Sequence, residues 1–284
     1  MPEKNLMKKK LSLRLAALGS ALMLLLPLAL LTASPAQSYP CGRVSGCTSF
    51  ELVSAGAHYN WYPVLSRYEF KGGRTAPQQW KLTGNGRQYQ QNGMLTIVAN
   101  GGDHARPVAS TWSTISKVTG RWESRMRTRT YAGAAPFRVQ LALIPDDRAE
   151  RHCGAQEITF LDYRPSKSST AGFSVNTLPN HTFAYKKQLG RKVGGDEWHV
   201  FGVEVTTKHI AWFVDGRVAA IEKRPAALSG VALKMQARLV PTDGAKMEKT
   251  RLQLDWARYW TMKKKGKALG KAAQPTQKVN KKAC

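Results

Sequence analysis

Acidic residues are scarce in this sequence. The 284 residues include 18 Asp and Glu against 44 Lys and Arg, which gives a formal net charge of +26. Residues 1–38 carry +4, residues 263–284 carry +8, and the remaining +14 lies on residues 39–262. A field of this sign attracts polyanions in general. The partners that we expect outside a cell are anionic wall polymers, acidic polysaccharides and lipid headgroups.

Long apolar runs are also scarce, because Leu15–Leu31 is the only segment apolar enough to span a membrane. It follows three lysines and precedes the small residues Ala36 and Ser38, an order typical of a secretory signal peptide over residues 1–38. A membrane anchor is the alternative, since the run is close to the minimum span of roughly 17 residues. We expect bacterial-type export to the medium or cell wall, no remaining transmembrane span, and no nucleic-acid partner.

Only four cysteines are present, and no CxxC or His-rich spacing accompanies them. We therefore expect no metal site and no cofactor. An oxidising compartment favours disulfides. Cys41 and Cys47 are close enough to close a small loop, and Cys153 and Cys284 are left for a second bridge, although four cysteines allow three pairings.

Helical periodicity is missing from every segment longer than about ten residues. Short runs of alternating polarity separated by turn residues take its place, as in Phe137–Ile144, and Asp215-Gly216 reads as a hairpin turn. Many short strands of this kind predict a sandwich or barrel. We expect one all-β domain over residues 66–262, as a monomer, after an N-terminal segment over residues 39–65. Residues 263–284 lack aromatics and carry eight lysines, which predicts a basic disordered tail.

The segment that carries chemistry is Gln156–Tyr163. Period-two alternation places Glu157 and Thr159 on one face and the apolar Ile158 and Phe160 on the other. Asp162 lies five residues beyond Glu157, so it needs one β-bulge to reach the polar face. Two carboxylates along one strand suit a retaining glycosidase, in which they lie about 5–5.5 Å apart.

In its order Glu157-x-Thr159-x-x-Asp162, this strand resembles the Glu-x-Asp-x-x-Glu strand of glycoside hydrolase family 16. Other segments between Tyr68 and Trp260 resemble that family's strands in the same order. They are Tyr68–Gly72, Asn92–Ile97, Ser116–Arg125, Glu197–Val205, His209–Gly216 and Leu254–Tyr259. The resemblance implies a jelly-roll β-sandwich of two antiparallel sheets, of the concanavalin A-like lectin/glucanase type.

The same resemblance implies a secreted hydrolase of O-glycosyl bonds in a β-glucan-like polysaccharide. Glu157 takes the position of the nucleophile and Asp162 that of the acid/base, while Thr159 replaces the middle Asp. Asn176 stands where the family often has a histidine. The candidate sugar-binding residues are polar groups on neighbouring strands and aromatics able to stack on sugar rings: Arg138, Gln140, Tyr163, Ser174, Asn176 and Trp112.

Two alternatives stay open. A shortened acid at Asp162 and the loss of the middle Asp at Thr159 favour a module that binds glycan or cell wall without turnover. The other alternative is a wall-associated structural protein outside the cell that acts through its charge alone.

Overall fold

The computed structural model describes residues 54–63, 66–99, 106–130, 137–154, 156–165, 169–189, 196–242, 247 and 250–280. All of these lie in one compact unit, Pro40–Cys284. The predicted signal peptide over residues 1–38 and the side chains of the four cysteines lie outside the described part of the chain. No helix among the described residues is long and apolar enough to cross a membrane.

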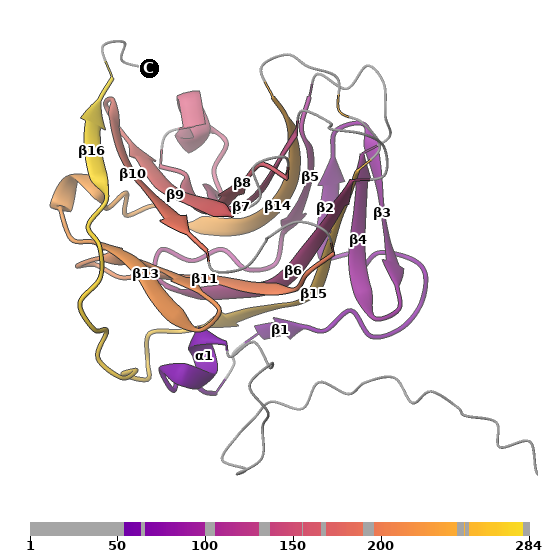
Figure 1. Cartoon of the computed structure of the whole chain (residues 1–284), viewed down its shortest axis with the longest axis horizontal. Coiled ribbons are helices and arrows are strands. Elements are labelled where there is room, and N and C mark those ends of the chain that lie inside the picture. Colours follow the sequence, from indigo (N-terminus) through magenta and orange to yellow (C-terminus); the bar gives the residue numbers. More distant parts are fainter. Residues whose placement is uncertain are drawn as a thin grey trace, which may run out of the picture. The chain divides into compact units, whose positions relative to one another are not determined.

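The fold consists of two antiparallel sheets that pack face to face (Figure 1). The first, here called the β6 sheet, has the order β13-β12-β11-β6-β15-β4-β3, with β1 paired to β15. The second, the β8 sheet, has the order β16-β10-β9-β8-β7-β14-β5-β2. This arrangement confirms the predicted all-β jelly-roll sandwich.

Strand bounds in the β6 sheet are β1 Ser66–Tyr68, β3 Gly86–Gln91, β4 Met94–Ala99, β6 Gly120–Thr130, β11 His199–Val205, β12 Ile210–Val214, β13 Arg217–Glu222 and β15 Thr250–Trp260. Those in the β8 sheet are β2 Trp80–Thr83, β5 Val108–Trp112, β7 Phe137–Pro145, β8 Ile158–Tyr163, β9 Thr170–Thr177, β10 His181–Gln188, β14 Leu233–Pro241 and β16 Thr276–Val279. The described residues also form three short helices, α1 Ala55–His58, η1 Ala149–Gly154 and η2 Pro225–Ala227.

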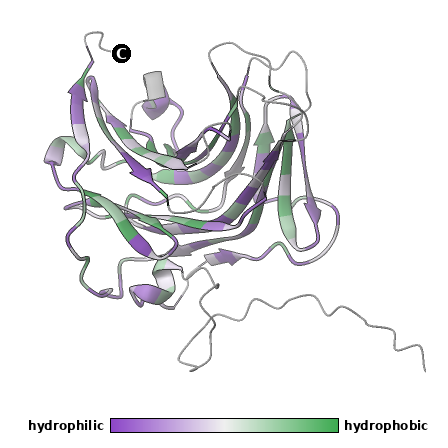
Figure 2. Ribbon diagram, in the orientation of Figure 1, coloured by the Kyte–Doolittle hydropathy of each residue, from purple (hydrophilic) through white to green (hydrophobic). Residues whose placement is uncertain are grey.

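The core lies between the two sheets because apolar residues alternate with polar ones along their strands (Figure 2). In β9, every second residue from Ala171 to Thr177 is buried and those between are partly exposed. The β8 sheet therefore has one face on the core and one face turned away from it, as antiparallel sheets commonly do. Figure 1 shows this sheet curved, with the outward face on the inside of the curve, and we call it the concave face.

Residues 54–63 pack against the β6 sheet. The N-terminus of α1 meets the buried carboxylate of Glu123 on β6, which accepts hydrogen bonds from the backbone N–H of Ala55 (2.5 Å) and Gly56 (3.4 Å). Trp61 packs edge-on against Phe213. The part of the predicted N-terminal segment that the structure describes is thus attached to the sandwich by one buried carboxylate and one aromatic cluster.

The predicted disordered tail is wrong for residues 263–280. β16 adds to the edge of the β8 sheet by pairing with β10, and Ala273 accepts a hydrogen bond from the backbone N–H of Ile221 (2.9 Å). Arg224 donates to the carbonyl of Pro275 (2.5 Å) and to the fully buried Glu222. A Lys-rich segment with few apolar residues cannot form a core, but an open sheet edge offers it backbone partners instead.

Candidate active site

A β-bulge in β8 shapes the site. In the ladder with β7, Leu141 pairs with Leu161 and Ala142 pairs with Thr159, so one extra residue lies on β8 at this point. The register with β9 shifts in the same interval, between Thr159 and Asp162. The predicted bulge is confirmed, and it turns Thr159 and Asp162 to the concave face while Phe160 stays in the core.

Glu157, directly before β8, is held by Arg238 of β14. The guanidinium donates to both carboxylate oxygens, from Nη1 to Oε2 at 3.1 Å and from Nη2 to Oε1. Thr159 adds a hydrogen bond from its hydroxyl to Oε1 at 3.1 Å. The side chains of Glu157 and Arg238 are 15% and 16% exposed, so this bidentate pair is largely shielded from water. The carboxylate is fixed in one orientation, and a cation balances its charge.

Gln140 of β7 connects this pair to the second carboxylate. Its Oε1 accepts a hydrogen bond from Nε of Arg238 (2.7 Å), and its Nε2 donates to Oδ2 of Asp162 (3.2 Å). Arg138, two residues earlier on β7, forms an ion pair with Oδ1 of Asp162 at 3.4 Å. Glu157 and Asp162 therefore belong to one polar network that crosses β8, β7 and β14.

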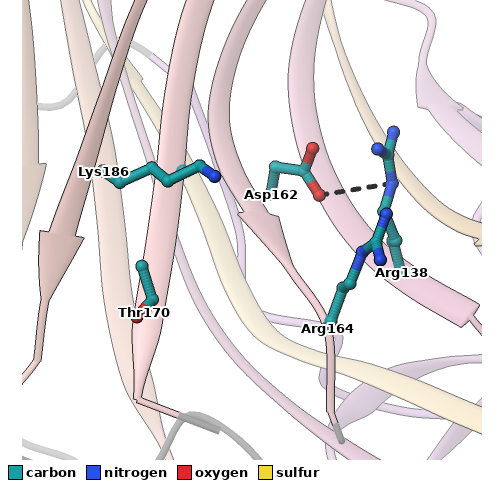
Figure 3. A pocket seen from close by; sticks show the side chains of 6 residues that line it. Arg138, Asp162, Arg164, Thr170 and Lys186 are labelled. Atoms are coloured by element: carbon teal, nitrogen blue, oxygen red, sulfur yellow. Dashed lines mark ion pairs between the residues drawn. The ribbon is translucent and has the colours of Figure 1, made fainter. Parts of the chain in front are cut away.

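Asp162 lies in a pocket of about 490 Å³. The pocket is lined by Arg138, Asp162, Arg164, Thr170, Gly172 and Lys186. Figure 3 shows the ammonium group of Lys186 on one side of the Asp162 carboxylate and the guanidinium groups of Arg138 and Arg164 on the other. Three cationic side chains therefore lie around one carboxylate in this pocket.

Within the described part of the chain, no group of three or more His, Cys, Asp and Glu side chains is placed to hold a metal ion. The chemistry available on the concave face is that of carboxylates, amides, hydroxyls and cations.

No protein-family model matches the sequence, and no curated protein matches it. Solved structures do match. The catalytic domain of an endo-1,3-β-glucanase (laminarinase) from Thermotoga petrophila has a TM-score of 0.57 and 13% identity over 71% of this chain and 98% of its own. A mutant of SCLam, a non-specific endo-β-1,3(4)-glucanase from family GH16, has a TM-score of 0.59 and 11% identity over 70% of this chain and 95% of its own. The laminarinase from Rhodothermus marinus has a TM-score of 0.57 and 16% identity over 70% of this chain and 96% of its own.

This chain has a GH16-like fold. At such low identity the likeness concerns the fold, so the roles of individual residues rest on the geometry of the site itself.

Four of the predicted sugar-binding residues lie on the concave face of the GH16-like sandwich. Arg138 and Gln140 contact Asp162, as described above. Ser174 lies beside Thr159 in the ladder between β8 and β9. Asn176 accepts a hydrogen bond from the hydroxyl of Thr182 at 2.9 Å. These residues extend the polar surface from β7 across β8 to β10.

The two predicted stacking residues are in the core, so this part of the prediction is wrong. Trp112 is 1% exposed and stacks on Trp80, with ring centroids 5.8 Å apart. Tyr163 is also 1% exposed, and burial raises the pKa of its hydroxyl to about 12. Neither ring can reach a ligand on the concave face.

Sequence reasoning missed Arg238, Arg164 and Lys186. A usable signal existed for Arg238, because β14 alternates buried Leu233, Met235, Ala237 and Leu239 with polar residues at 234, 236 and 238. Arg164 directly follows β8, and Lys186 is one of two adjacent lysines on β10. Nothing in those two positions marks a site until the sheet brings them beside Asp162.

Proposed function

We propose that this protein is a glycoside hydrolase that cleaves O-glycosidic bonds of a polysaccharide bound along the concave face of the β8 sheet. The observation that carries the proposal is the bulge in β8, which brings Asp162 to the same open face as Glu157 and Thr159, beside a pocket. Double-displacement hydrolysis uses two carboxyl groups that flank the scissile bond, and a strand with two carboxylates on one face can supply them. The signal-peptide pattern of residues 1–38 supports action outside the cell.

In this proposal Glu157 is the nucleophile, because Arg238 and Thr159 orient its carboxylate. A carboxylate oxygen attacks the anomeric carbon while protonated Asp162 gives its proton to the leaving glycosidic oxygen. The C–O bond breaks and a glycosyl ester forms on Glu157. Asp162 then takes a proton from water, the water oxygen attacks the anomeric carbon, and Glu157 leaves as a carboxylate.

A second function, glycan binding without turnover, is favoured by the charges around both carboxylates. Arg238 occupies both oxygens of Glu157, and three cations line the pocket of Asp162. A general acid has to carry a proton before it can give one away. In the structure both oxygens of Asp162 are engaged, one by Gln140 and the other by Arg138, so neither carboxylate is free of protein partners and binding can persist where hydrolysis is slow.

The proposed activity is tested by incubating the protein with neutral β-1,3- and β-1,4-glucans, galactans and acidic polysaccharides. We expect new reducing ends from at least one of them, with the anomeric configuration of the product retained by NMR, since the ester mechanism inverts the anomeric carbon twice. Polysaccharide binding is measured in parallel by affinity electrophoresis. Binding without any release would reject the hydrolase and leave the binding module.

The length of the acid is tested by Asp162→Glu. Aspartate is one methylene shorter than glutamate, which withdraws the carboxyl by about 1.5 Å. A displacement of about 1 Å can lower a rate about 100-fold, so we expect Asp162→Glu to raise reducing-end release by about tenfold or more. Asp147→Glu is the matched control, because Asp147 is exposed and its carboxylate accepts a hydrogen bond from the backbone N–H of Ala149 (2.9 Å), outside the pocket of Asp162. An unchanged or lower rate for Asp162→Glu would show that the length of this side chain does not limit turnover.

A further inference from the structure

The concave face has little of what a neutral sugar needs. Sites for uncharged ligands are lined largely by apolar and aromatic side chains. Every aromatic side chain on β7, β8 and β9 belongs to the core, as does Phe183 on β10, while Tyr185 packs against the core. β14 contains no aromatic residue. On these five described strands, no aromatic ring is therefore available to stack on a sugar bound to the concave face.

The concave face carries cationic side chains instead of aromatic ones. The pocket beside Asp162 has three cations, Arg138, Arg164 and Lys186, against one carboxylate. Arg138 is paired with Asp162, which leaves two cations over. Neither Arg164 nor Lys186 forms an ion pair with another residue in the ranges that the structure describes. The pocket thus holds an excess of positive charge that no acidic side chain in the described ranges neutralises.

Gly172 of β9 lines the pocket without a side chain. A Cβ at this position would lie 3.3 Å from the carbonyl oxygen of Asp162 and 3.4 Å from its Cβ, so the adjacent strand leaves little room for one. Gly172 therefore adds no side chain beside Asp162, whose carboxylate lies between the ammonium group of Lys186 and the guanidinium of Arg164 (Figure 3).

We propose that this pocket is a subsite for the anionic group of an acidic polysaccharide, a carboxylate or a sulfate carried on the sugar ring. The proposal rests on the proposed function, since it takes the concave face as the glycan groove, and it replaces a neutral β-glucan with a charged glycan as the substrate class. Arg164 offers a planar fork of donors that fits either anion in a bidentate manner, and Lys186 offers a point charge.

A general attraction between a chain of net charge +26 and any polyanion must be separated from a specific subsite. Lys187 and Arg87 provide the comparison. Lys187 is next to Lys186 on β10 but points to the opposite face, and Arg87 is exposed on β3 of the β6 sheet. The variants Arg164→Gln/Lys186→Gln and Arg87→Gln/Lys187→Gln remove the same charge, and only the first pair is in the pocket.

The experiment measures, by isothermal titration calorimetry at about 0.15 M salt, the binding of short oligosaccharides to the wild type and both double variants. The probes are an oligogalacturonate, which carries carboxylates, a sulfated galactan oligosaccharide, and an uncharged β-1,3-glucan oligosaccharide of equal length. We expect the wild type to prefer one anionic probe over the neutral one by about tenfold or more. The two anionic probes distinguish the carboxylate from the sulfate.

Arg164→Gln/Lys186→Gln is expected to lose at least about tenfold in affinity for the preferred anionic probe, with binding of the neutral probe unchanged. Arg87→Gln/Lys187→Gln should stay within about twofold of the wild type. Equal losses in the two double variants, or a wild type that prefers the neutral probe, would overturn the subsite. Because this readout is binding, it stands apart from turnover: a protein that binds the anionic probe at the pocket and hydrolyses nothing refutes the hydrolase and supports the subsite.

Discussion

Replacing the proposed nucleophile, Glu157→Gln, is expected to lower reducing-end release at least about 10³-fold. An amide cannot form the glycosyl ester through which the proposed reaction passes. Glutamine nevertheless keeps an oxygen that accepts from Thr159 and Arg238, so the side chain can stay in place. The rate of release is followed by a reducing-end assay on the polysaccharide that the wild type cleaves, and binding of the same polysaccharide is expected to persist.

Three controls make this result specific. Glu197→Gln removes an exposed carboxylate elsewhere and should leave the rate unchanged. Because Glu157→Gln leaves Arg238 without its counter-charge, thermal unfolding is recorded for each variant. Adding formate to Glu157→Ala provides an independent readout, since the small carboxylate can occupy the vacated place beside Arg238 and restore part of the rate. Release that survives both substitutions would place the nucleophile elsewhere.

The fold and the central strand were accessible from the sequence because both depend on local patterns. Alternation of apolar and polar residues in Phe137–Ile144 predicted β7, and the spacing between Glu157 and Asp162 predicted the bulge that the ladders of β8 contain. A bulge was the only way to put both carboxylates on a face that excludes Ile158 and Phe160. The sequence pattern therefore predicted the bulge in β8 as well as the strand itself.

The error at Tyr163 follows from the same pattern. Once the bulge turns Asp162 to the concave face, the next residue has to face the core, and Tyr163 does so. Choosing Tyr163 for stacking therefore contradicted the predicted bulge. Trp112 failed for a different reason, because a single aromatic at the end of a strand does not tell which of its faces is buried.

The cationic partners of the two carboxylates could not be predicted from local sequence patterns. Arg238 is 81 residues from Glu157 in sequence, and it meets Glu157 only because β14 pairs with β7 on the side opposite β8. Lys186 reaches the Asp162 pocket from β10, two strands away. Which cations surround a carboxylate in a sheet is decided by strand order, and strand order is a property of the whole fold.

The buried carboxylate of Glu123 is expected to make the stability of the sandwich depend on pH. Glu123 is fully buried in β6 and accepts the backbone N–H groups of Ala55 and Gly56 at the start of α1. Burial raises the pKa of Glu123 from 4.5 to about 7, and it outweighs the hydrogen bonds from Ala55 and Gly56 and the nearby Arg258, which lower the pKa. The folded state therefore holds this proton more tightly than the unfolded chain.

The direction of the effect follows from that difference. Below pH 4.5, the pKa of Glu123 in the unfolded chain, both states carry the proton and the stabilising contribution of Glu123 is fully present. This contribution is lost as the pH rises through about 7, the pKa of Glu123 in the folded state. The difference in pKa corresponds to about 3 kcal/mol of unfolding free energy. Urea unfolding at about pH 5 and about pH 8.5 measures it, with Glu123→Gln as the reference, because glutamine does not titrate.

We expect the unfolding free energy of the wild type to fall between these two pH values by about 2.5 kcal/mol more than that of Glu123→Gln, because part of the contribution is already lost at about pH 5. Glu197→Gln, which removes an exposed carboxylate, should follow the wild type. A wild type that gains stability relative to Glu123→Gln as the pH rises would mean that Glu123 is ionised at neutral pH. The two backbone N–H groups and Arg258 would then outweigh the cost of burial, and the attachment of α1 to the β6 sheet would be that of a charge at a helix N-terminus. The sign of the change in unfolding free energy with pH therefore decides whether a protonated or an ionised Glu123 holds residues 54–63 on the β6 sheet.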